Sequence, residues 1–230
     1  VSGFRPALVQ VQASNLATLG PLVGADLDAT ARDTLLQRIL AGIQTSPGVY
    51  VPKLGGVDRS TVAVIEQSPV AGTTRPKIAY FGAQDGMLHA VCASVQGVCT
   101  SLGKELWAYI PRTLLPILRY NSATIQGSPR VIDMFGDFDQ DGRKEFRTIL
   151  FFQTGEGEAT SLDRIPAVYA MDITDPQNPA VLWEYGMSSV TTRAAHELGQ
   201  GLIVAAGRVS VAGTQKLVAA TEIVPLRIHP

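Results

Sequence analysis

One pattern of short strands occurs twice in the sequence, in the same order. A Ser-Pro pair precedes a strand with two adjacent aromatic residues, then a strand ending in x-Ala, then Leu-Trp-x-Tyr. The copies are Ser68-Pro69, Tyr80-Phe81, His89-Ala90 and Leu106–Tyr109, and Ser128-Pro129, Phe151-Phe152, Tyr169-Ala170 and Leu182–Tyr185. Four strands per repeated unit are typical of β-propeller blades. A third, partial copy is predicted from Leu198-Gly199 through Leu202–Val204 and Lys216–Ala220.

Two and a half blades are too few to close a ring, because a propeller has at least about four. We therefore expect a mostly β fold, a partial β-propeller that forms part of a longer protein. The chain begins with Val rather than Met, so the lack of a signal peptide carries no weight.

The strands are predicted from short apolar runs that follow Thr61 and are separated by turn residues. Each run is rich in β-branched or aromatic residues and too short for a helix. The runs are TVAVI, KIAYFG, LHAVCA, ELWAYI, RTILFF, AVYAMDI and AVLWEY. The 22 Gly and 14 Pro residues also argue against a bundle of long helices.

Before these runs, the sequence predicts one helix from Asp28 to Ile43, with Asp28 as its N-cap and Gly42 near its end. Apolar residues recur there at steps of three and four: Leu35, Leu36, Ile39, Leu40 and Ile43. We thus expect a helical and loop lead-in over 1–60 and a partial β-propeller domain over 61–230.

The charge balance excludes some classes of function. The chain has 19 basic and 20 acidic residues, with a net charge of -1, so it does not suit nucleic-acid binding by bulk phosphate neutralisation. Its longest apolar stretch, near Leu202–Ala206, is far shorter than the ~20 residues that span a bilayer. The 46% of apolar residues are enough to form a buried core.

Cys92 and Cys99 are the only cysteines, and their spacing fits neither a CxxC redox motif nor a zinc motif. A disulfide between them would close a short loop and stabilise the fold by roughly 2.5 kcal/mol. It would also indicate folding outside the cytoplasm. Two buried free thiols are the alternative.

The sharpest chemical motif is an acidic loop, Asp137-Phe-Asp-Gln-Asp-Gly-Arg-Lys-Glu145. Carboxylates at loop positions 1, 3 and 5 can surround a hard cation, and Gly142 at position 6 allows a sharp turn. Position 12, where an EF-hand has its bidentate Glu, is Thr148, so the helix-loop-helix form is excluded. The expected ligands are Asp137, Asp139, Asp141, the backbone carbonyl of Arg143, and Glu145.

Repulsion among these four carboxylates supports a bound cation. At about 4 Å and an effective dielectric constant near 20, each pair costs about 4 kcal/mol. A divalent ion would offset this repulsion, and an all-protein, flexible ligand set favours Ca²⁺ over Mg²⁺. The alternative is a solvated acidic turn.

Other motifs do not indicate catalysis. His89, His196 and His229 lie far apart, without zinc spacing, and no hydrolase, dinucleotide or P-loop signature occurs. Asp85-Gly86 predicts a hairpin turn, and His89 is interpreted as a packing residue. Trp107 and Trp183 occupy equivalent repeat positions, which favours packing between blades over a ligand platform.

Four segments together resemble the C-terminal propeller of the PilY family of type IV pilus biogenesis and tip-adhesin proteins. They are RPKIAYFGAQDGMLHAV (75–91), GKELWAYIPRTLLP (103–116), QGSPRVIDMFGDFDQDGRKEFRTILFF (126–152) and VYAMDITDPQNPAVLWEYG (168–186). The resemblance covers roughly Thr61 to Val209. It fades beyond Val209, and EQSPVAG is shorter than the family's usual pattern.

The resemblance implies a modified propeller of the quinoprotein-like class with a nine-residue calcium loop, and no enzymatic activity. It implies a role in pilus biogenesis and surface attachment, with minor pilins of the pilus tip complex and a host or abiotic surface as partners. The expected location is the periplasm, the cell surface or the pilus tip. In the family, calcium occupancy is linked to pilus extension and retraction.

A quinoprotein dehydrogenase that uses pyrroloquinoline quinone (PQQ) is the alternative, because its propeller repeats also contain Trp and Gly. Those enzymes hold calcium and quinone at the propeller axis, often beside a disulfide between adjacent cysteines. Here the cysteines are seven positions apart, and the acidic motif is a local loop that needs no cofactor oxygen. We therefore expect a non-enzymatic protein.

Overall fold

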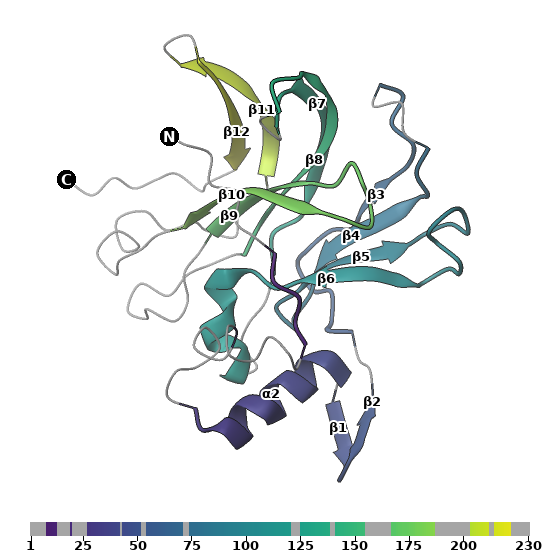
Figure 1. The fold of residues 1–230 in the computed structure, drawn as a ribbon, viewed down its shortest axis with the longest axis vertical. Coiled ribbons are helices and arrows are strands. Elements are labelled where there is room, and N and C mark those ends of the chain that lie inside the picture. The colour runs from purple at the N-terminus through teal and green to yellow at the C-terminus, as the bar shows by residue number, and fades with distance from the viewer. Residues whose placement is uncertain are drawn as a thin grey trace, which may run out of the picture.

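The computed structural model describes residues 8–12, 19, 27–41, 43–51, 54–70, 74–120, 125–138, 141–154, 167–186, 203–211 and 214–221. Figure 1 shows two four-stranded antiparallel sheets, with helix α2 (Ala29–Ala41) and the hairpin of β1 (Ile43–Ser46) and β2 (Val49–Val51) at one end. The mostly β fold is thereby confirmed. The two sheets and the hairpins that accompany them do not form a closed ring in the described part of the chain.

Each sheet is built from four consecutive strands in simple up-and-down order. Sheet 1 contains β3 (Ala63–Ile65), β4 (Ile78–Gly82), β5 (Leu88–Cys92) and β6 (Glu105–Tyr109). Sheet 2 contains β7 (Arg130–Gly136), β8 (Glu145–Gln153), β9 (Ala167–Asp172) and β10 (Ala180–Gly186). The prediction of four strands per unit is confirmed for both copies, although no predicted apolar run covered β7.

The repeated residues occupy the same row in both sheets, across the second, third and fourth strands. The rows are Tyr80, Ala90 and Trp107 in sheet 1, and Phe151, Ala170 and Trp183 in sheet 2. A register shift follows at the same place in each sheet, where Leu106 and Leu182 are extra residues on the fourth strand. The repeat read from the sequence is therefore a structural repeat.

The Ser-Pro pairs do not match in this way. Ser68-Pro69 lies after the first strand of sheet 1, whereas Ser128-Pro129 lies directly before the first strand of sheet 2. Ser60, which precedes the first strand of sheet 1, contacts the segment that leads into sheet 2: its Oγ donates to the carbonyl of Gly127 (3.2 Å) and accepts from the amide of Gly82 (3.1 Å). The equivalence of the two Ser-Pro pairs was wrong, because an identical dipeptide does not fix strand register.

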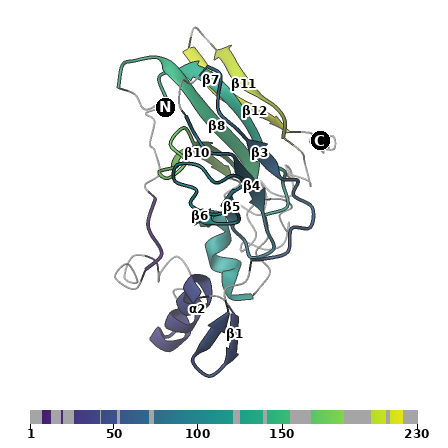
Figure 2. The ribbon, with the colours of Figure 1, turned by 90° about the vertical axis from the view of Figure 1, so that its right-hand side faces the viewer.

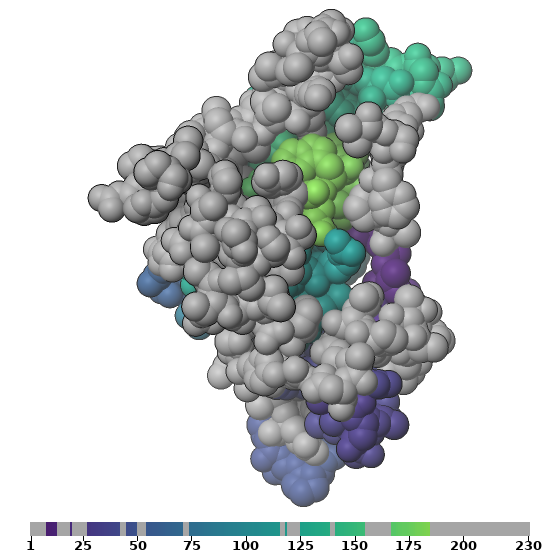
Figure 3. Space-filling model, turned by 90° about the vertical axis from the view of Figure 1, so that its left-hand side faces the viewer, coloured from purple at the N-terminus to yellow at the C-terminus, as the bar shows by residue number. Residues whose placement is uncertain are grey.

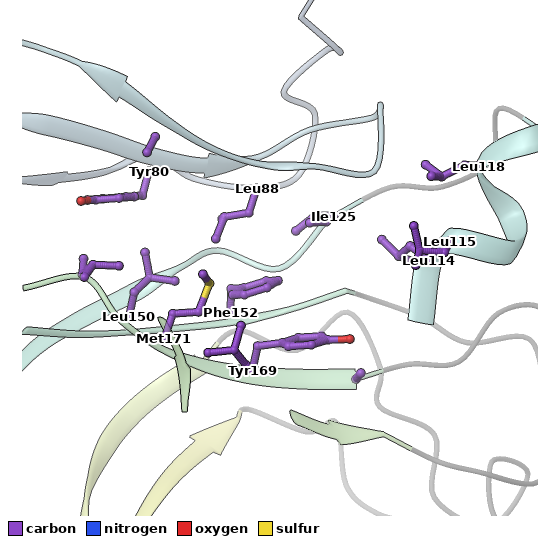
Figure 4. Close-up of a cluster of buried hydrophobic side chains, with 14 of the residues drawn as sticks. Tyr80, Leu88, Leu114, Leu115, Leu118, Ile125, Leu150, Phe152, Tyr169 and Met171 are labelled. Carbon is purple, nitrogen blue, oxygen red and sulfur yellow. The ribbon is translucent and has the colours of Figure 1, made fainter. Parts of the chain in front are cut away.

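The main core lies between the two sheets, as Figure 4 shows. Tyr80 and Leu88 of sheet 1 face Leu150, Phe152 and Met171 of sheet 2, and all five side chains are almost fully buried. At one end the core is closed by the 3₁₀ helix η2 (Arg112–Tyr120), through residues that include Leu114, Leu115 and Leu118, and by Leu35 and Leu36 of α2.

A second, smaller core covers the opposite face of sheet 2. It contains Met134, Ile149, Phe151, Val168 and Ala170. The hairpin of β11 (Ile203–Val211) and β12 (Thr214–Thr221) lies beside this sheet, with β11 next to β7 and β8 (Figures 1 and 2). These two strands contain Ile203–Val204 and Lys216–Ala220 of the predicted third, partial copy, whereas its Leu198-Gly199 and Leu202 lie outside the described residues.

The two sheets are stacked head to tail. The Tyr80 row lies on the face of sheet 1 that packs against sheet 2, whereas the equivalent Phe151 row lies on the face of sheet 2 that points away from sheet 1. Equivalent faces therefore point in the same direction along the stack, and the second sheet repeats the orientation of the first.

The N-terminal helix differs in part from its prediction. Asp28 caps it as expected, because Oδ1 of Asp28 accepts the amide of Ala31 at 2.8 Å. The helix ends at Ala41, however, and Ile43 begins strand β1 instead of the last helical turn. Gly42, the expected stop, lies outside the described residues. In the described part of the chain, no helix is long and apolar enough to cross a membrane.

A buried polar network ties sheet 1 to sheet 2. The hydroxyl of Thr148 donates to Asp133 Oδ1 (2.6 Å) and accepts from Arg75 Nη1 (2.7 Å). Arg75 also donates from Nε to the carbonyl of Glu66 (2.6 Å), and Ser68 Oγ donates to Asp133 Oδ2 (2.5 Å). Burial lowers the pKa of Arg75, and the charge of Asp133 opposes this effect. The guanidinium and carboxylate are thus joined through one hydroxyl.

We expect Thr148→Val to destabilise the fold by about 1–3 kcal/mol, because a side chain of similar volume leaves the buried Arg75 and the half-buried Asp133 without their shared partner. Thr148→Ser is the matched control, since it keeps the hydroxyl and loses one methyl group, at a cost of about 1 kcal/mol. Urea unfolding measures both. A Val variant as stable as the Ser variant would contradict the role of the hydroxyl.

Cys92 and Cys99 are joined by a disulfide, with their Cα atoms 5.5 Å apart. The bond joins Cys92, the last residue of β5, to Cys99 in the segment that connects β5 to β6. We expect Cys92→Ala with Cys99→Ala to lower the free energy of unfolding by roughly 2.5 kcal/mol, because the unfolded chain regains the entropy of the opened loop. Dithiothreitol should destabilise the parent protein and leave this variant unchanged. Labelling of both thiols in the native, unreduced protein would refute the pairing.

Candidate functional site

The acidic loop joins β7 to β8 and lies at the end of the molecule opposite α2 and the β1–β2 hairpin (Figures 1 and 2). In Figure 3 this end projects at the upper right, away from the dark α2 at the bottom. The strands pair up to Gly136 and Glu145, so the loop begins and ends at one ladder position. Asp137 is half-buried, whereas Asp141 and Glu145 are exposed.

Backbone amides curl the loop around Asp137. Its Oδ1 accepts the amide of Asp141 and its Oδ2 accepts the amide of Gly142, both at 3.1 Å. Gly142 has a φ of 87°, a conformation that residues with a side chain rarely adopt. The amide of Arg143 donates to Asp141 Oδ1 at 2.7 Å. Each of these carboxylate oxygens still has a lone pair for a cation.

Glu145 already has a positively charged side chain as its partner. Its carboxylate forms an ion pair with Arg147 two residues along β8. Arg147 also lies 3.6 Å from Asp172 Oδ2, at the end of β9. A metal that used Glu145 would therefore compete with Arg147 for this carboxylate.

The structure places Asp137, Asp141 and Arg143 on one turn, and Glu145 follows them as the first residue of β8. Asp139 lies outside the described residues. Within the part of the chain that is described, no three His, Cys, Asp or Glu side chains are grouped closely enough to hold a metal ion. The donors are hard oxygen atoms of the kind Ca²⁺ prefers, and a complete shell would need Asp139.

A second charged cluster, which the sequence did not indicate, surrounds His89. The imidazole is 3% exposed, and its Nδ1 lies 2.5 Å from Glu105 Oε1. Its Nε2 lies 3.1 Å from Asp85 Oδ2, and its ring stacks on Phe81 at 5.5 Å between centroids. His89 is thus a packing residue, as interpreted, but it also joins two carboxylates.

This cluster holds a protonated imidazole. Burial works to lower the pKa of His89, but hydrogen bonds and charges from Asp85 and Glu105 outweigh it and raise the pKa to about 9. Burial likewise works to raise the pKa of Asp85, and its bonds to His89, Gly55 and Met87 bring it below its usual value. Because Asp85 Oδ2 accepts the amide of Gly55 at 2.8 Å, the cluster also fixes the chain that leads into sheet 1.

The Asp85-Gly86 turn between β4 and β5 is confirmed, and Gly86 has a φ of 81°. The partner of His89 across the sheet, Glu105, follows it by 16 residues and belongs to no recognisable motif. Only the pairing of β5 with β6 brings the two together.

Trp107 packs between the sheets, as its repeat position predicted. Its indole Nε1 donates to the carbonyl of Pro176, in the turn between β9 and β10, at 2.9 Å. Its ring lies 5.8 Å from that of Tyr80, between centroids. The equivalent pair in sheet 2, Phe151 and Trp183, is 6.0 Å apart.

Comparison with known proteins gives one distant similarity. No family model matches the chain, and no solved structure matches it significantly. The chain is 30% identical over 158 residues to a curated protein of Xylella fastidiosa (strain Temecula1), described as a type IV pilus biogenesis factor PilY1 homolog. The match covers 64% of this chain and 11% of that protein. It supports a distant relationship to PilY-like proteins.

We expect stability to fall as the pH rises from 6.5 to 9. The folded-state pKa of His89 lies above the value of 6.5 for an unperturbed imidazole, so its contribution is complete below pH 6.5 and disappears above pH 9. The change is on the order of 3 kcal/mol. Urea unfolding at several pH values measures it.

His89→Gln should remove this pH dependence, and Glu105→Gln, which removes one partner, should reduce it. An unchanged slope in the His89→Gln protein would show that another group titrates in this range.

Proposed function

We propose that this chain is the calcium-binding, partial β-propeller portion of a type IV pilus biogenesis factor that acts in pilus assembly and surface attachment, without catalysis. The observation that carries the proposal is the 158-residue similarity to a protein described as a type IV pilus biogenesis factor. The chain covers 11% of that protein, so the activity and partners of the whole protein are part of the proposal.

The fold is compatible with propeller blades in two respects. Both sheets are four-stranded antiparallel meanders, and they stack in the same orientation, as successive blades do. The hairpin of β11 and β12 lies against the outer face of sheet 2, where a further blade would begin.

Calcium would be held by the carboxylates of Asp137, Asp139, Asp141 and Glu145, with the carbonyl of Arg143. A bound divalent ion would neutralise the mutual repulsion of these carboxylates. The hydrogen bonds from backbone amides to Asp137 and the left-handed conformation of Gly142 already curl the chain in the direction that such a shell needs. Arg147 neutralises Glu145 when no metal uses it.

The proposed location is outside the cytoplasm, at the periplasm, the cell surface or the pilus tip. The Cys92–Cys99 disulfide supports it, because such bonds persist in oxidising compartments. The proposed partners are minor pilins at the tip and a host or abiotic surface.

We expect the protein to bind Ca²⁺ with a dissociation constant of ~0.1–1 mM, the range of extracellular modules, and to melt at a higher temperature when calcium is present. Asp137→Ala or Asp141→Ala should sharply weaken calcium binding. Either change should also abolish the increase in melting temperature that calcium causes. Isothermal titration calorimetry and thermal melts measure these effects.

Asp175→Asn is the matched control, because Asp175 is also an exposed carboxylate that accepts a backbone amide in a turn, from Gln177 at 2.9 Å. Its calcium titration should equal that of the parent protein. Equal titrations for the Asp137 and Asp175 variants would eliminate the calcium assignment.

The cellular role is tested by deleting the gene in its host and counting surface pili and attached cells. Loss of both, with rescue by the parent gene, is the expected result. Normal piliation in the deletion strain would contradict the assembly role. A purified protein with a dialysis-resistant quinone absorbance would contradict the non-enzymatic role.

A further inference from the structure

Both ring nitrogens of His89 face a carboxylate, and this arrangement requires a proton on each of them. Nδ1 lies 2.5 Å from Glu105 Oε1, and Nε2 lies 3.1 Å from Asp85 Oδ2. An ionised carboxylate only accepts hydrogen bonds, and a neutral imidazole carries one N–H group whereas an imidazolium carries two. When His89 loses a proton, one of the two carboxylates therefore loses its donor and faces a nitrogen lone pair.

The other contacts of the two carboxylates decide which of them leaves. Asp85 is also held by the backbone amides of Gly55 (2.8 Å) and Met87 (3.1 Å), and its side chain is 21% exposed. Among the described residues, His89 is the only hydrogen-bond or ion-pair partner of the Glu105 side chain, which is 48% exposed. Glu105 can therefore exchange the imidazole for water by rotating outwards, whereas Asp85 would have to break two amide bonds.

The charged groups that face the imidazole come from two elements. Asp85 belongs to the turn between β4 and β5, and Glu105 begins β6. From β4, the ring of His89 meets the uncharged Phe81. In the part of the chain that the structure describes, the two carboxylates are the charges that act on the pKa of His89. The response to pH thus depends on one ring proton and two side chains.

We propose that His89 is a one-sided pH switch, in which loss of the Nδ1 proton to solvent releases Glu105 into water while Nε2 keeps its proton and its bond to Asp85. The released carboxylate adds an uncompensated negative charge at the edge of sheet 1. The switch lies entirely within sheet 1, so it does not depend on the calcium site proposed in sheet 2.

Release of Glu105 loosens the base of the disulfide-closed connection between β5 and β6. Glu105 is the first residue of β6 and lies beside a register shift that interrupts the ladder with β5. Just before it, the amide of Cys92 donates to Lys104 O (2.8 Å), and the amide of Gly103 donates to Cys92 O (2.9 Å). The contact of Glu105 with His89 adds a side-chain link across the strands at this interrupted point, and the switch removes it.

The segment that leads into sheet 1 keeps its place during this change. Asp85 still accepts the amide of Gly55, and the amide of Gln84 donates to Gly56 O at 2.9 Å. A side chain at Gly55 would come within 2.5 Å of the backbone nitrogen of Asp85, so the segment lies directly against the turn. The switch therefore acts on the start of β6 and leaves the lead-in fixed.

The test follows the two ring nitrogens of His89 by NMR in protein labelled with ¹⁵N-histidine. The chain has three histidines, and the His89 signals are those that His89→Gln removes. Below the His89 pKa of about 9, both ring nitrogens should be protonated. Above it, Nδ1 should show the chemical shift of a bare nitrogen, and Nε2 should show that of an N–H group.

Hydrogen exchange reports the release itself. Across the same transition, the protection of the Gly103 amide should fall by about tenfold, because the start of β6 loses a hydrogen bond between charged groups. The Gly55 amide should keep its protection, since its acceptor does not move. Circular dichroism at each pH confirms that the protein remains folded.

Two variants separate the roles of the carboxylates. In Asp85→Asn, the new amide can donate to a bare Nε2, so the neutral ring should keep its proton on Nδ1 and Glu105 should stay bound. In Glu105→Gln, the new amide can donate to a bare Nδ1, so the ring should show the parent's tautomer. Gly103 should keep its protection in both variants.

Three results would overturn the proposal. A neutral ring that keeps its proton on Nδ1 in the parent protein would assign the release to Asp85. A ring that stays doubly protonated until the protein unfolds would show that the cluster does not switch. An equal loss of Gly103 protection in the Glu105→Gln protein would show that release of Glu105 is not its cause.

Discussion

The apolar contact between sheet 1 and sheet 2 is the constraint on which the rest of the structure depends. A four-stranded meander is stable only when its apolar face is covered, and here each sheet covers one face of its neighbour. Tyr80 and Leu88 on one side and Phe152 and Met171 on the other leave almost no surface exposed. The helices η2 and α2 close the end of this core, and the polar network around Thr148 crosses between the same two sheets.

Two sets of charged groups beside this core are paired. Arg75 and Asp133 share the hydroxyl of Thr148, and His89 lies between two carboxylates. The acidic turn is different, because it lies beyond the paired ends of β7 and β8 and its shape is set by its own amides. Among the described residues, Glu145 forms an ion pair with Arg147, which also lies beside Asp172 of sheet 2. A change at the turn can therefore occur with little disturbance of the core.

Much of the fold could be predicted from the sequence, because aromatic pairs and Leu-Trp-x-Tyr recur at positions that strand pairing makes equivalent. The rows through Trp107 and Trp183 are the clearest case. Other features carried no such signal. Ile43 follows a helical pattern but pairs with Val51 in a short hairpin, and this strand pairing replaces the last two residues of the predicted helix. Glu105 beside His89 depends on cross-strand register, and the match of the Ser-Pro pairs failed for the same reason. The acidic turn was located by its spacing alone, and its metal remains a proposal.

The order of the strands along the chain has a consequence for synthesis. Within each sheet, every strand pairs with the strand that precedes or follows it, so the pairings close short loops and should form quickly. Sheet 1 needs no residue beyond Tyr109 to complete its ladder, whereas its apolar face is covered only when residues 145–171 arrive. A ribosome-bound chain therefore passes through an interval in which a finished sheet exposes Tyr80 and Leu88. During this interval the exposed apolar face can aggregate, and a chaperone that covers it would prevent this.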